Sequence, residues 1–302
     1  MGLSIYNIKK WAKMFAGKSV LHVNQNMGQA FIVGELKGYF NDLTQKVLMD
    51  PEYVDSTEFP TVKTEHGKDV LFPVAIFQYA LGCWDLYQLN NDMRYKNKFI
   101  ACADWAVKKQ EPNGAWNNFF FAYPDNPYGA MAQGEAASVL VRAWSITKDD
   151  KYLAAARCAV DFMLKSVDNG GTSRYTENGL VLLEYTHLPA VLNGWVFSLF
   201  GLYDLCIACN EEKYKAALKK TLGTLEETMP KFDCGFWSSY DLDNHIASPF
   251  YHRLHIAQMN ALVRITKKDI YYKYYLKWSE EEESKFKKFR ATLVKGFQKI
   301  RS

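Results

Sequence analysis

The chain has 302 residues, of which 48% are hydrophobic and 15% aromatic, and its formal net charge is +4. The hydrophobic share is enough for a substantial core, and so small a charge gives no reason to expect a nucleic-acid partner. The N-terminal residues lack the continuous apolar run of a signal peptide, and no uninterrupted apolar stretch is long enough to span a membrane. We therefore expect a cytoplasmic protein without a transmembrane segment.

Residues 1–66 are predicted to form an irregular, partly β N-terminal segment that packs against a helical body. Residues 1–17 can form a short amphipathic basic helix, which either docks on the body or touches a membrane loosely. Residues 20–23 are mostly apolar and residues 30–33 form an apolar run, with glycines nearby, and this pattern predicts two short strands.

Residues 67–302 follow the helical period and are predicted to form one α/α-barrel domain. Four pairs of helices separated by short turns are expected over residues 73–87 and 93–110, 128–147 and 150–167, 189–210 and 212–229, and 251–266 and 269–287. The first helix of each pair starts about 60 residues after the previous one, which indicates an internal repeat. The predicted fold is mainly α, an incomplete α/α-toroid of about four helical hairpins.

Three long loops join one hairpin to the next and should emerge at the same end of the ring. They contain Trp116, the pair Glu184 and Tyr185, and the segment 237–241. Long loops gathered on one face of a rigid scaffold often carry binding and chemistry, so we expect the site at this end.

Glu184 directly follows the apolar run 180–183, which places its carboxyl where partial burial is expected. Burial raises a carboxyl pKa, as a general acid or a proton donor to a substrate carboxylate would need. The alternative is a glutamate that caps a helix or forms a salt bridge.

Three tyrosines, Tyr185, Tyr240 and Tyr251, lie in or beside these loops. A phenol with a pKa near 10 is a poor base in water, but next to a cation or in a pocket rich in donors it can move protons. Each tyrosine alone would more often be structural, whereas three near one loop face favour a catalytic role.

A histidine-rich segment offers a second reading of the same region. It contains three histidines and two aspartates, namely His245, His252, His255, Asp241 and Asp243. Their spacing matches no recognised ligand pattern, and Arg253 separates the two helical histidines. We therefore favour substrate hydrogen bonding or core packing over metal binding, and predict no metal. Gln133, Glu135 and Asn193 are expected to point to the same face.

The remaining motifs argue against several enzyme classes. No GxxxxGK[ST], GxGxxG, HExxH or GxSxG motif is present, which disfavours the usual nucleotide enzymes, zinc proteases and serine hydrolases. Cys206 and Cys209 form a lone CxxC pair, which is weak support for a metal site. Most of the six cysteines lie beside apolar residues in helical patterns, so buried, reduced thiols are expected.

Short motifs across residues 68–265 resemble the D-glucuronyl C5-epimerases, which invert C5 of glucuronate inside heparan-type polysaccharides. The matching segments are residues 128–135, 141–143, 184–185, 191–194, 198–205, 240–242, 251–252 and 255–256. The resemblance implies an α/α-barrel catalytic domain in which Glu184, Tyr185, Tyr240 and Tyr251 occupy catalytic positions. Asp243 and Asn244 stand where animal members carry a basic residue that contacts the acidic chain.

The resemblance also implies an isomerase that works without a cofactor and converts D-glucuronate to L-iduronate residues. One group removes the C5 proton and another returns a proton from the opposite face, with two tyrosines as base and acid. Substrate contacts are expected from Trp116, Gln133, Asn193, Trp237, His252, Arg253 and His255. The expected partner is an acidic polysaccharide, and a homodimer is left open.

Two other functions stay open at this point. A polysaccharide lyase shares the first step and then expels the C4 substituent, so the same residues would serve it. A non-catalytic glycan-binding protein would keep the loops without the proton transfer. A glycoside hydrolase is disfavoured because it needs two opposed carboxylates, and only Glu184 stands out, with Asp241 a weak second.

Overall fold

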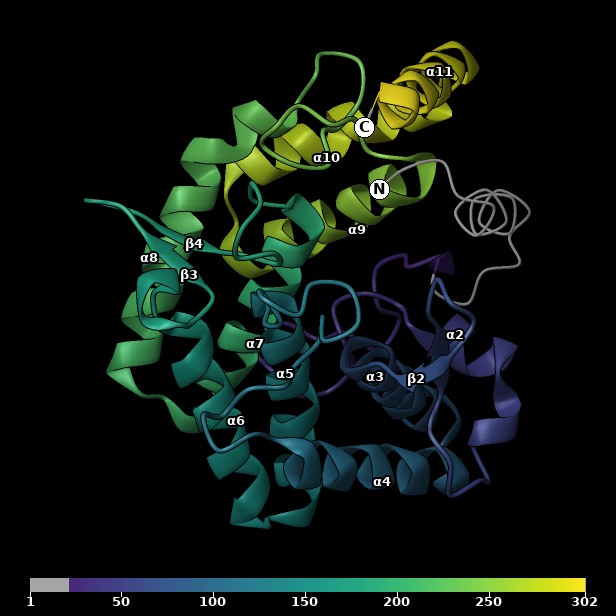
Figure 1. The fold of residues 1–302 in the computed structure, drawn as a ribbon, viewed down its shortest axis with the longest axis vertical. Helices are drawn as coiled ribbons and strands as arrows, with labels where there is room; N and C mark the ends of the chain where they lie inside the picture. Colours follow the sequence, from purple (N-terminus) through teal and green to yellow (C-terminus); the bar gives the residue numbers. More distant parts are fainter. Residues whose placement is uncertain (1–21, 302) are drawn as a thin grey trace.

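The computed structural model describes residues 22–301, so the helix expected over 1–17 and the start of the strand expected over 20–23 lie outside the described residues. Four helical hairpins form an incomplete α/α-toroid, which confirms the predicted fold class (Figure 1). The paired helices are α3 (Pro73–Asn90) and α4 (Met93–Lys109), α5 (Ala130–Thr147) and α6 (Asp150–Leu164), α7 (Leu192–Cys209) and α8 (Glu212–Thr228), and α9 (Pro249–Thr266) and α10 (Asp269–Glu283). A further helix, α11 (Lys285–Arg301), follows them.

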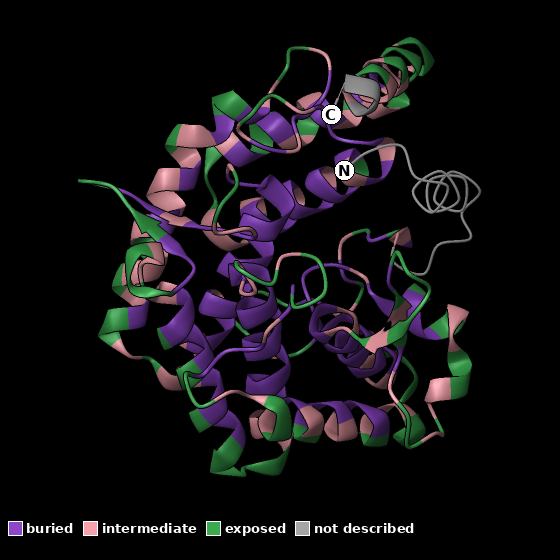
Figure 2. Ribbon diagram, viewed as in Figure 1, coloured by how far each residue is buried: buried purple, intermediate pink, exposed green. Residues whose placement is uncertain are grey.

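The first helix of each hairpin lies inside the ring and the second lies outside. Figure 2 shows α5 and α7 buried along most of their length, whereas the outer helices α6 and α8 are exposed on one face. α5 and α7 approach each other at glycines, because a Cβ on Gly201 would lie 2.1 Å from the carbonyl oxygen of Gly134. These glycines let the two backbones meet without side chains between them.

The four turns inside the hairpins share one backbone conformation. Each inner helix ends on a residue in the left-handed conformation, whose N–H donates to the carbonyl oxygen four residues earlier. These residues are Asn91 (φ 54), Lys148 (φ 58), Asn210 (φ 53) and Lys267 (φ 58). The repeat predicted from the sequence therefore extends to the backbone conformation of its turns.

Only short strands accompany the helices in the described part of the chain. β1 (Thr61–Lys63) pairs with β2 (Asp69–Leu71), and β3 (Ser173–Tyr175) pairs with β4 (Leu180–Leu182), both antiparallel. β4 is the apolar strand expected before Glu184. The other short elements are α2 (Thr44–Met49), η2 (Pro51–Tyr53), η3 (Val167–Asn169) and η4 (Met229–Phe232).

The strand predicted over residues 30–33 is wrong. These residues form a turn closed by a hydrogen bond from the Gly38 N–H to the Ala30 carbonyl, and Ile32 and Val33 are exposed. Phe31 is buried in the core, but the run has no partner strand and so no ladder to join, and His22 and Val23 likewise belong to no strand.

The N-terminal segment connects the two ends of the ring. Asp85 on α3 accepts a hydrogen bond from the Tyr39 N–H at 2.8 Å, and the His22 ring lies 5.1 Å from the Phe250 ring on α9. Arg142 on α5 donates to the carbonyl oxygens of Lys37 and Gly38 and pairs with buried Asp204, which ties the segment to the inner helices.

Helix α7 meets the length and composition criteria for a membrane span, with a mean hydropathy of 1.4, but 72% of it is buried inside the protein. Burial at the centre of the ring accounts for its apolar composition.

All six cysteines are free, and Cys83 and Cys102 are buried as expected. Cys158, which lies in a helical pattern, is exposed, so the expectation of burial is wrong for this thiol, and Cys234 in the loop before α9 is exposed as well.

Candidate active site

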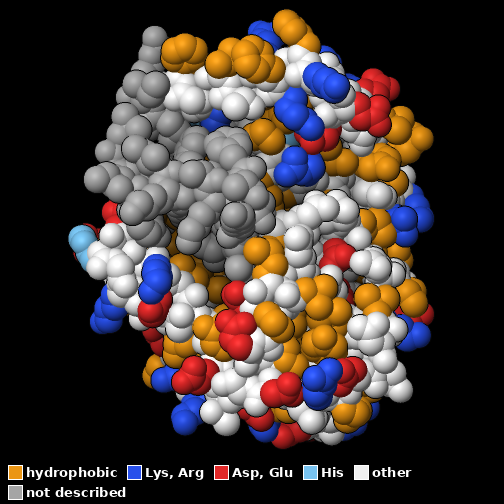
Figure 3. All heavy atoms as spheres, turned by 90° about the vertical axis from the view of Figure 1, so that its right-hand side faces the viewer, with side chains coloured by type: hydrophobic (Ala, Val, Ile, Leu, Met, Phe, Trp, Pro, Cys, Tyr) orange, Lys and Arg blue, Asp and Glu red, His pale blue; other side chains and the backbone are white. Residues whose placement is uncertain are grey.

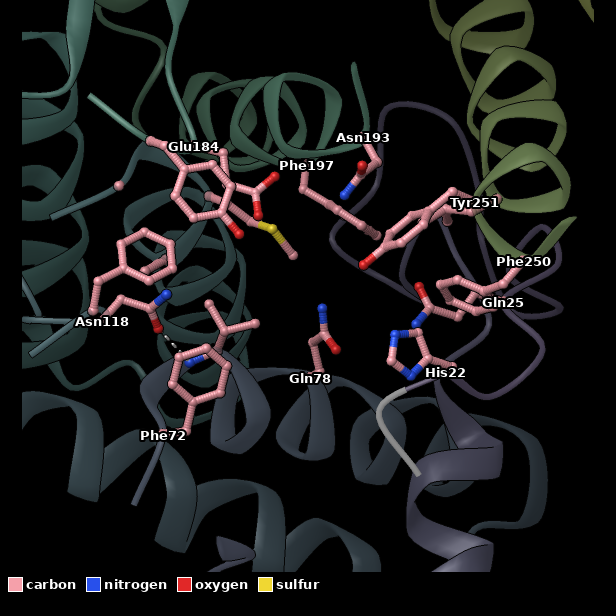
Figure 4. Close-up of a pocket in the computed structure, with 17 residues that line it drawn as sticks. His22, Gln25, Phe72, Gln78, Asn118, Glu184, Asn193, Phe197, Phe250 and Tyr251 are labelled. Atoms are coloured by element: carbon pink, nitrogen blue, oxygen red, sulfur yellow. Dashed lines mark hydrogen bonds between the residues drawn. The ribbon is translucent and has the colours of Figure 1, made fainter. Parts of the chain in front are cut away.

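A cavity of about 200 Å³ lies where the inner helices meet the long loops. Glu184, Asn193 and Tyr251 point into it from one side and Gln78 from the other (Figure 4). Its lining is His22, Gln25, Phe72, Val74, Gln78, Asn118, Phe119, Gly129, Met131, Ala132, Glu184, Tyr185, Asn193, Phe197, Phe250, Tyr251 and Leu254. The cavity thus brings together four of the residues singled out from the sequence: Glu184, Tyr185, Asn193 and Tyr251.

Two glycines make the room that Glu184 occupies. A Cβ on Gly194 would lie 2.2 Å from Oε2 of Glu184, and a Cβ on Gly129 would lie 2.1 Å from its carbonyl oxygen. The Ala130 N–H donates to the Leu183 carbonyl at 2.8 Å, so the start of α5 holds the end of the loop. The backbone therefore fixes Glu184 tightly between α5 and α7.

The Glu184 carboxyl is buried without a charged partner among the described residues, and Oε2 has no hydrogen-bond donor there. Burial raises the pKa of Glu184 to about 7, and the Tyr185 hydroxyl offsets part of this rise. Near neutral pH the carboxyl therefore exists in both forms. The salt-bridge alternative considered for this glutamate finds no partner in residues 22–301.

The three tyrosines lie around Glu184 in two groups. The Tyr185 ring stacks on Phe119 with centroids 4.7 Å apart, and the Tyr251 ring lies 4.9 Å from the Tyr240 ring. Tyr240 is outside the cavity lining and reaches it through Tyr251. Its loop is attached to α7, because the Leu192 N–H donates to the Tyr240 carbonyl at 3.0 Å.

All three phenols are held in the neutral form. Burial raises the pKa of Tyr185, Tyr240 and Tyr251 above the usual range, and the nearby charge of Glu184 raises each further. Lysine and arginine are absent from the cavity lining in the described part of the chain. Of the two settings that could favour a phenolate, the described lining therefore offers no cation, and Lys295 lies beyond it, 5.4 Å from the centroid of the Tyr240 ring.

Two of the expected substrate contacts lie in the core instead. The indole N–H of Trp116 donates to the Ala106 carbonyl, and the Gln133 side chain bonds to both the N–H and the carbonyl of Trp116. Both residues are buried and neither lines the cavity. Their contacts support a role in holding the loop that contains Trp116.

Trp237 and the two helical histidines also lie in the core. The Trp237 ring stacks on His252 at 3.6 Å, and the Ser238 hydroxyl lies within 2.9 Å of Nδ1 of both His252 and His255. Burial lowers the pKa of His252 well below its usual range and that of His255 to about 3, so both are neutral. Of the two roles left open for them, the contacts support core packing that holds the Tyr240 loop.

Arg253 is on the surface and pairs with Glu282 at 3.3 Å. His245 binds Asp241 at 2.8 Å, outside the cavity lining. Among residues 22–301, no group of three histidine, cysteine, aspartate or glutamate side chains could hold a metal ion.

The structure adds polar residues that the sequence did not single out. Gln78 on α3 donates to Oε1 of buried Glu135 at 2.7 Å, and burial raises the pKa of Glu135 to about 8. Asn118 accepts from the Val74 N–H, which fixes its loop to the start of α3. Gln78 could have been noticed as a lone polar residue within the apolar run 73–84, whereas nothing in the local sequence marks Asn118.

Comparison with known proteins gives a consistent picture. The family model described as "D-glucuronyl C5-epimerase C-terminus" matches residues 111–280. The chain is 30% identical over 215 residues to a D-glucuronyl C5-epimerase of Caenorhabditis elegans, which is 61% of this chain and 35% of that protein. It is also 30% identical over 158 residues to an uncharacterized protein of Methanocaldococcus jannaschii, 50% of this chain and 51% of that protein. The chain thus spans between about a third and a half of these relatives.

A solved structure of similar fold is the cellobiose 2-epimerase of Bacillus thermoamylovorans, with a TM-score of 0.55 and 9% identity. The match covers 78% of this chain and 68% of that one. At such low identity the likeness speaks for the α/α-toroid fold alone.

Proposed function

Because the chain belongs to the D-glucuronyl C5-epimerase C-terminal family, we propose that it is a polysaccharide uronate C5-epimerase that converts D-glucuronate to L-iduronate residues. The observation that carries this proposal is the cavity in which a buried carboxyl with a pKa of about 7 lies beside Tyr185 and Tyr251. Inversion at C5 needs one group to remove a proton and another to return one from the opposite face. Tyr185 and Tyr251 come from different parts of the chain and offer two such groups.

The raised pKa of the phenols restricts how the first step can occur. A neutral phenol can take the C5 proton only if its own proton leaves at the same time. Ionised Glu184 is the acceptor beside Tyr185, so the C5 proton moves to Tyr185 while the Tyr185 proton moves to Glu184. The electron pair of the C5–H bond passes to the substrate carboxylate.

Protonated Glu184 then stabilises this intermediate. It becomes a hydrogen-bond donor at the moment when charge builds up on the substrate carboxylate, and such a donor is most effective in a buried site. Tyr251 returns a proton to the opposite face of C5, and its phenolate then takes up a proton while Glu184 releases the one it gained, so that all three groups return to their starting forms. No electrons are gained or lost, so the proposed reaction requires no redox cofactor, and protonated Glu184 is the group proposed to stabilise the charge on the substrate carboxylate.

An acidic polysaccharide is the proposed substrate, and its charge must be met at the rim of the cavity. Lys295 of α11 is the proposed cation, because its ammonium lies 5.4 Å from the centroid of the Tyr240 ring. It would take the part of the basic residue that animal relatives carry where this chain has Asp243 and Asn244.

The test is incubation with an unsulfated heparan-type glucuronate polysaccharide in deuterated water, followed by NMR. We expect deuterium at C5 together with iduronate signals. An unsaturated, ultraviolet-absorbing product would identify a lyase instead. Binding of the polysaccharide without any exchange at C5 would identify a glycan-binding protein and refute the proposed activity.

A further inference from the structure

Helix α11 presents an apolar stripe to solvent. Phe286, Phe289, Leu293 and Phe297 are 74%, 62%, 47% and 62% exposed. Their spacing of three and four residues places them on one face of the helix. Single exposed apolar side chains are common on soluble proteins, whereas a continuous stripe of this kind marks an interaction surface.

The opposite face of α11 is fastened to the body, so the stripe cannot turn inward. Ala291 is buried beside Trp237, and the Gln298 side chain accepts from the Ile246 N–H at 2.9 Å and donates to the Asn244 carbonyl at 3.0 Å. At the edge of the stripe, the Arg290 guanidinium lies 3.8 Å from the centroid of the Phe236 ring and so also contacts the body. These contacts fix the rotation of the helix about its axis.

The charge of α11 has one sign. Its sequence contains seven lysines and arginines and no aspartate or glutamate. Lys287 and Lys288 pair with glutamates at the end of α10, and Lys285 and Arg290 are exposed next to the stripe. At the top of Figure 3, where α11 lies, apolar side chains are at the surface with basic side chains beside them.

We propose that α11 binds an anionic membrane surface, with the helix parallel to the bilayer and its four apolar side chains at the boundary between head groups and acyl chains. A helix with phenylalanine and leucine on one face and lysine and arginine on the other is suited to this position. The surrounding basic residues match the negative charge of anionic lipid head groups.

Two other occupants fit the same surface less well. A second copy of the chain would bring its own basic residues against Lys285 and Arg290, and like charges across an interface oppose association. An acidic polysaccharide would meet the basic residues but would leave the phenylalanines in water. The bilayer satisfies both the apolar and the charged parts.

The test is sedimentation of the full chain with phosphatidylcholine vesicles, prepared with and without phosphatidylserine. We expect binding that is several-fold stronger with phosphatidylserine. The double variant Phe289→Ser with Phe297→Ser should bind at least about tenfold more weakly, since each exchange removes an apolar side chain from the bilayer. The matched control is Leu48→Ser with Met93→Ser, two exposed apolar residues elsewhere, and it should bind as the original chain does.

The possible outcomes distinguish a membrane from a second copy of the chain and from a polysaccharide as the partner of the stripe. Equal loss of vesicle binding in the control pair, or no binding of the original chain to either vesicle, would refute the proposal. Light scattering that shows a dimer abolished by Phe289→Ser with Phe297→Ser would assign the stripe to a second copy. Binding to a soluble heparan-type polysaccharide that is lost in the same variant, without vesicle binding, would assign it to the polysaccharide. The measurement does not depend on turnover, so it stands apart from the proposed epimerase activity.

Discussion

Glu184 occupies an environment that few carboxyls share, since it is buried, has no cation beside it in the described residues, and has glycines where its neighbours would otherwise collide with it. In the proposed relay its ionised form accepts the Tyr185 proton. Turnover should therefore rise as the pH increases through about 7, the pKa of Glu184. A turnover that falls over the same range would mean that protonated Glu184 is the starting form.

Glu184→Gln keeps the shape of the side chain but cannot accept a proton. We expect turnover to fall by about 2 to 4 orders of magnitude, the usual scale for a proton-transfer group, with little change in polysaccharide binding. The melting temperature should be unchanged or higher, because a buried ionisable group is removed. Glu227→Gln, an exchange at an exposed glutamate of α8, is the control and should leave turnover intact. A variant that melts much lower but turns over normally when folded would show a structural role instead.

Replacement of Tyr185, Tyr240 and Tyr251 by phenylalanine, one at a time, removes only the hydroxyl. We expect Tyr185→Phe and Tyr251→Phe to lose about 2 to 4 orders of magnitude in turnover, and Tyr240→Phe to lose less, because Tyr240 lies outside the cavity lining. Tyr272→Phe on the exposed face of α10 serves as the control. Near-normal turnover in all three loop variants would rule these tyrosines out as proton carriers.

At the level of elements, the left-handed turns of the hairpins offer a stability test. Lys267 adopts φ 58, which a residue with a side chain adopts at a cost and glycine adopts freely. Lys267→Gly should raise the free energy of unfolding by about 0.5 to 1 kcal/mol, since the relieved strain exceeds the added entropy of the unfolded glycine. The adjacent Lys268 has φ −90, so Lys268→Gly should not stabilise the protein. Denaturant unfolding of both variants would measure these differences in the free energy of unfolding.

The helical elements were predictable because their apolar residues repeat with a strong period, and the four hairpins appear where the sequence placed them. The conformation of the N-terminal segment could not be predicted, because it depends on contacts with α3, α5 and α9 that no local pattern encodes. The site was predicted in part. Motifs marked Glu184 and Tyr251, but whether Trp116 or Gln133 faces the cavity or the core depends on how the loops pack. Gln78 reaches the cavity from a helix far away in the sequence.

Across the whole molecule, buried carboxyls govern how stability depends on pH. Burial raises the pKa of Asp85 and Glu135 to about 8 and that of Glu184 to about 7. Such groups stabilise the folded state below their unfolded pKa, and this contribution is lost as the pH rises through the folded values. Buried Lys46, whose pKa is lowered to about 8, acts in the opposite sense, but only above that pH, where its folded and unfolded forms bind different numbers of protons. The melting temperature should therefore fall as the pH rises from the ordinary carboxyl pKa, about 4, to these folded values of about 7 and 8.

Glu135→Gln removes one of the three carboxyls and should make this fall shallower, which thermal scans at several pH values would show. An unchanged slope would mean that Glu135 does not titrate over this range. Exposed Glu227→Gln should not alter the slope.

The hydrogen bonds of Gln298 reach a segment 52 residues earlier, the loop that carries Tyr240. Helix α11 therefore restrains that loop. A membrane, a protease or a fused tag that loosens α11 would break the hydrogen bond from the Ile246 N–H. The amide hydrogen of Ile246 would then exchange faster, and the position of Tyr240 would be less well defined. The described residues of α11 would thus limit the motion of the loop that carries Tyr240, although none of them lines the cavity.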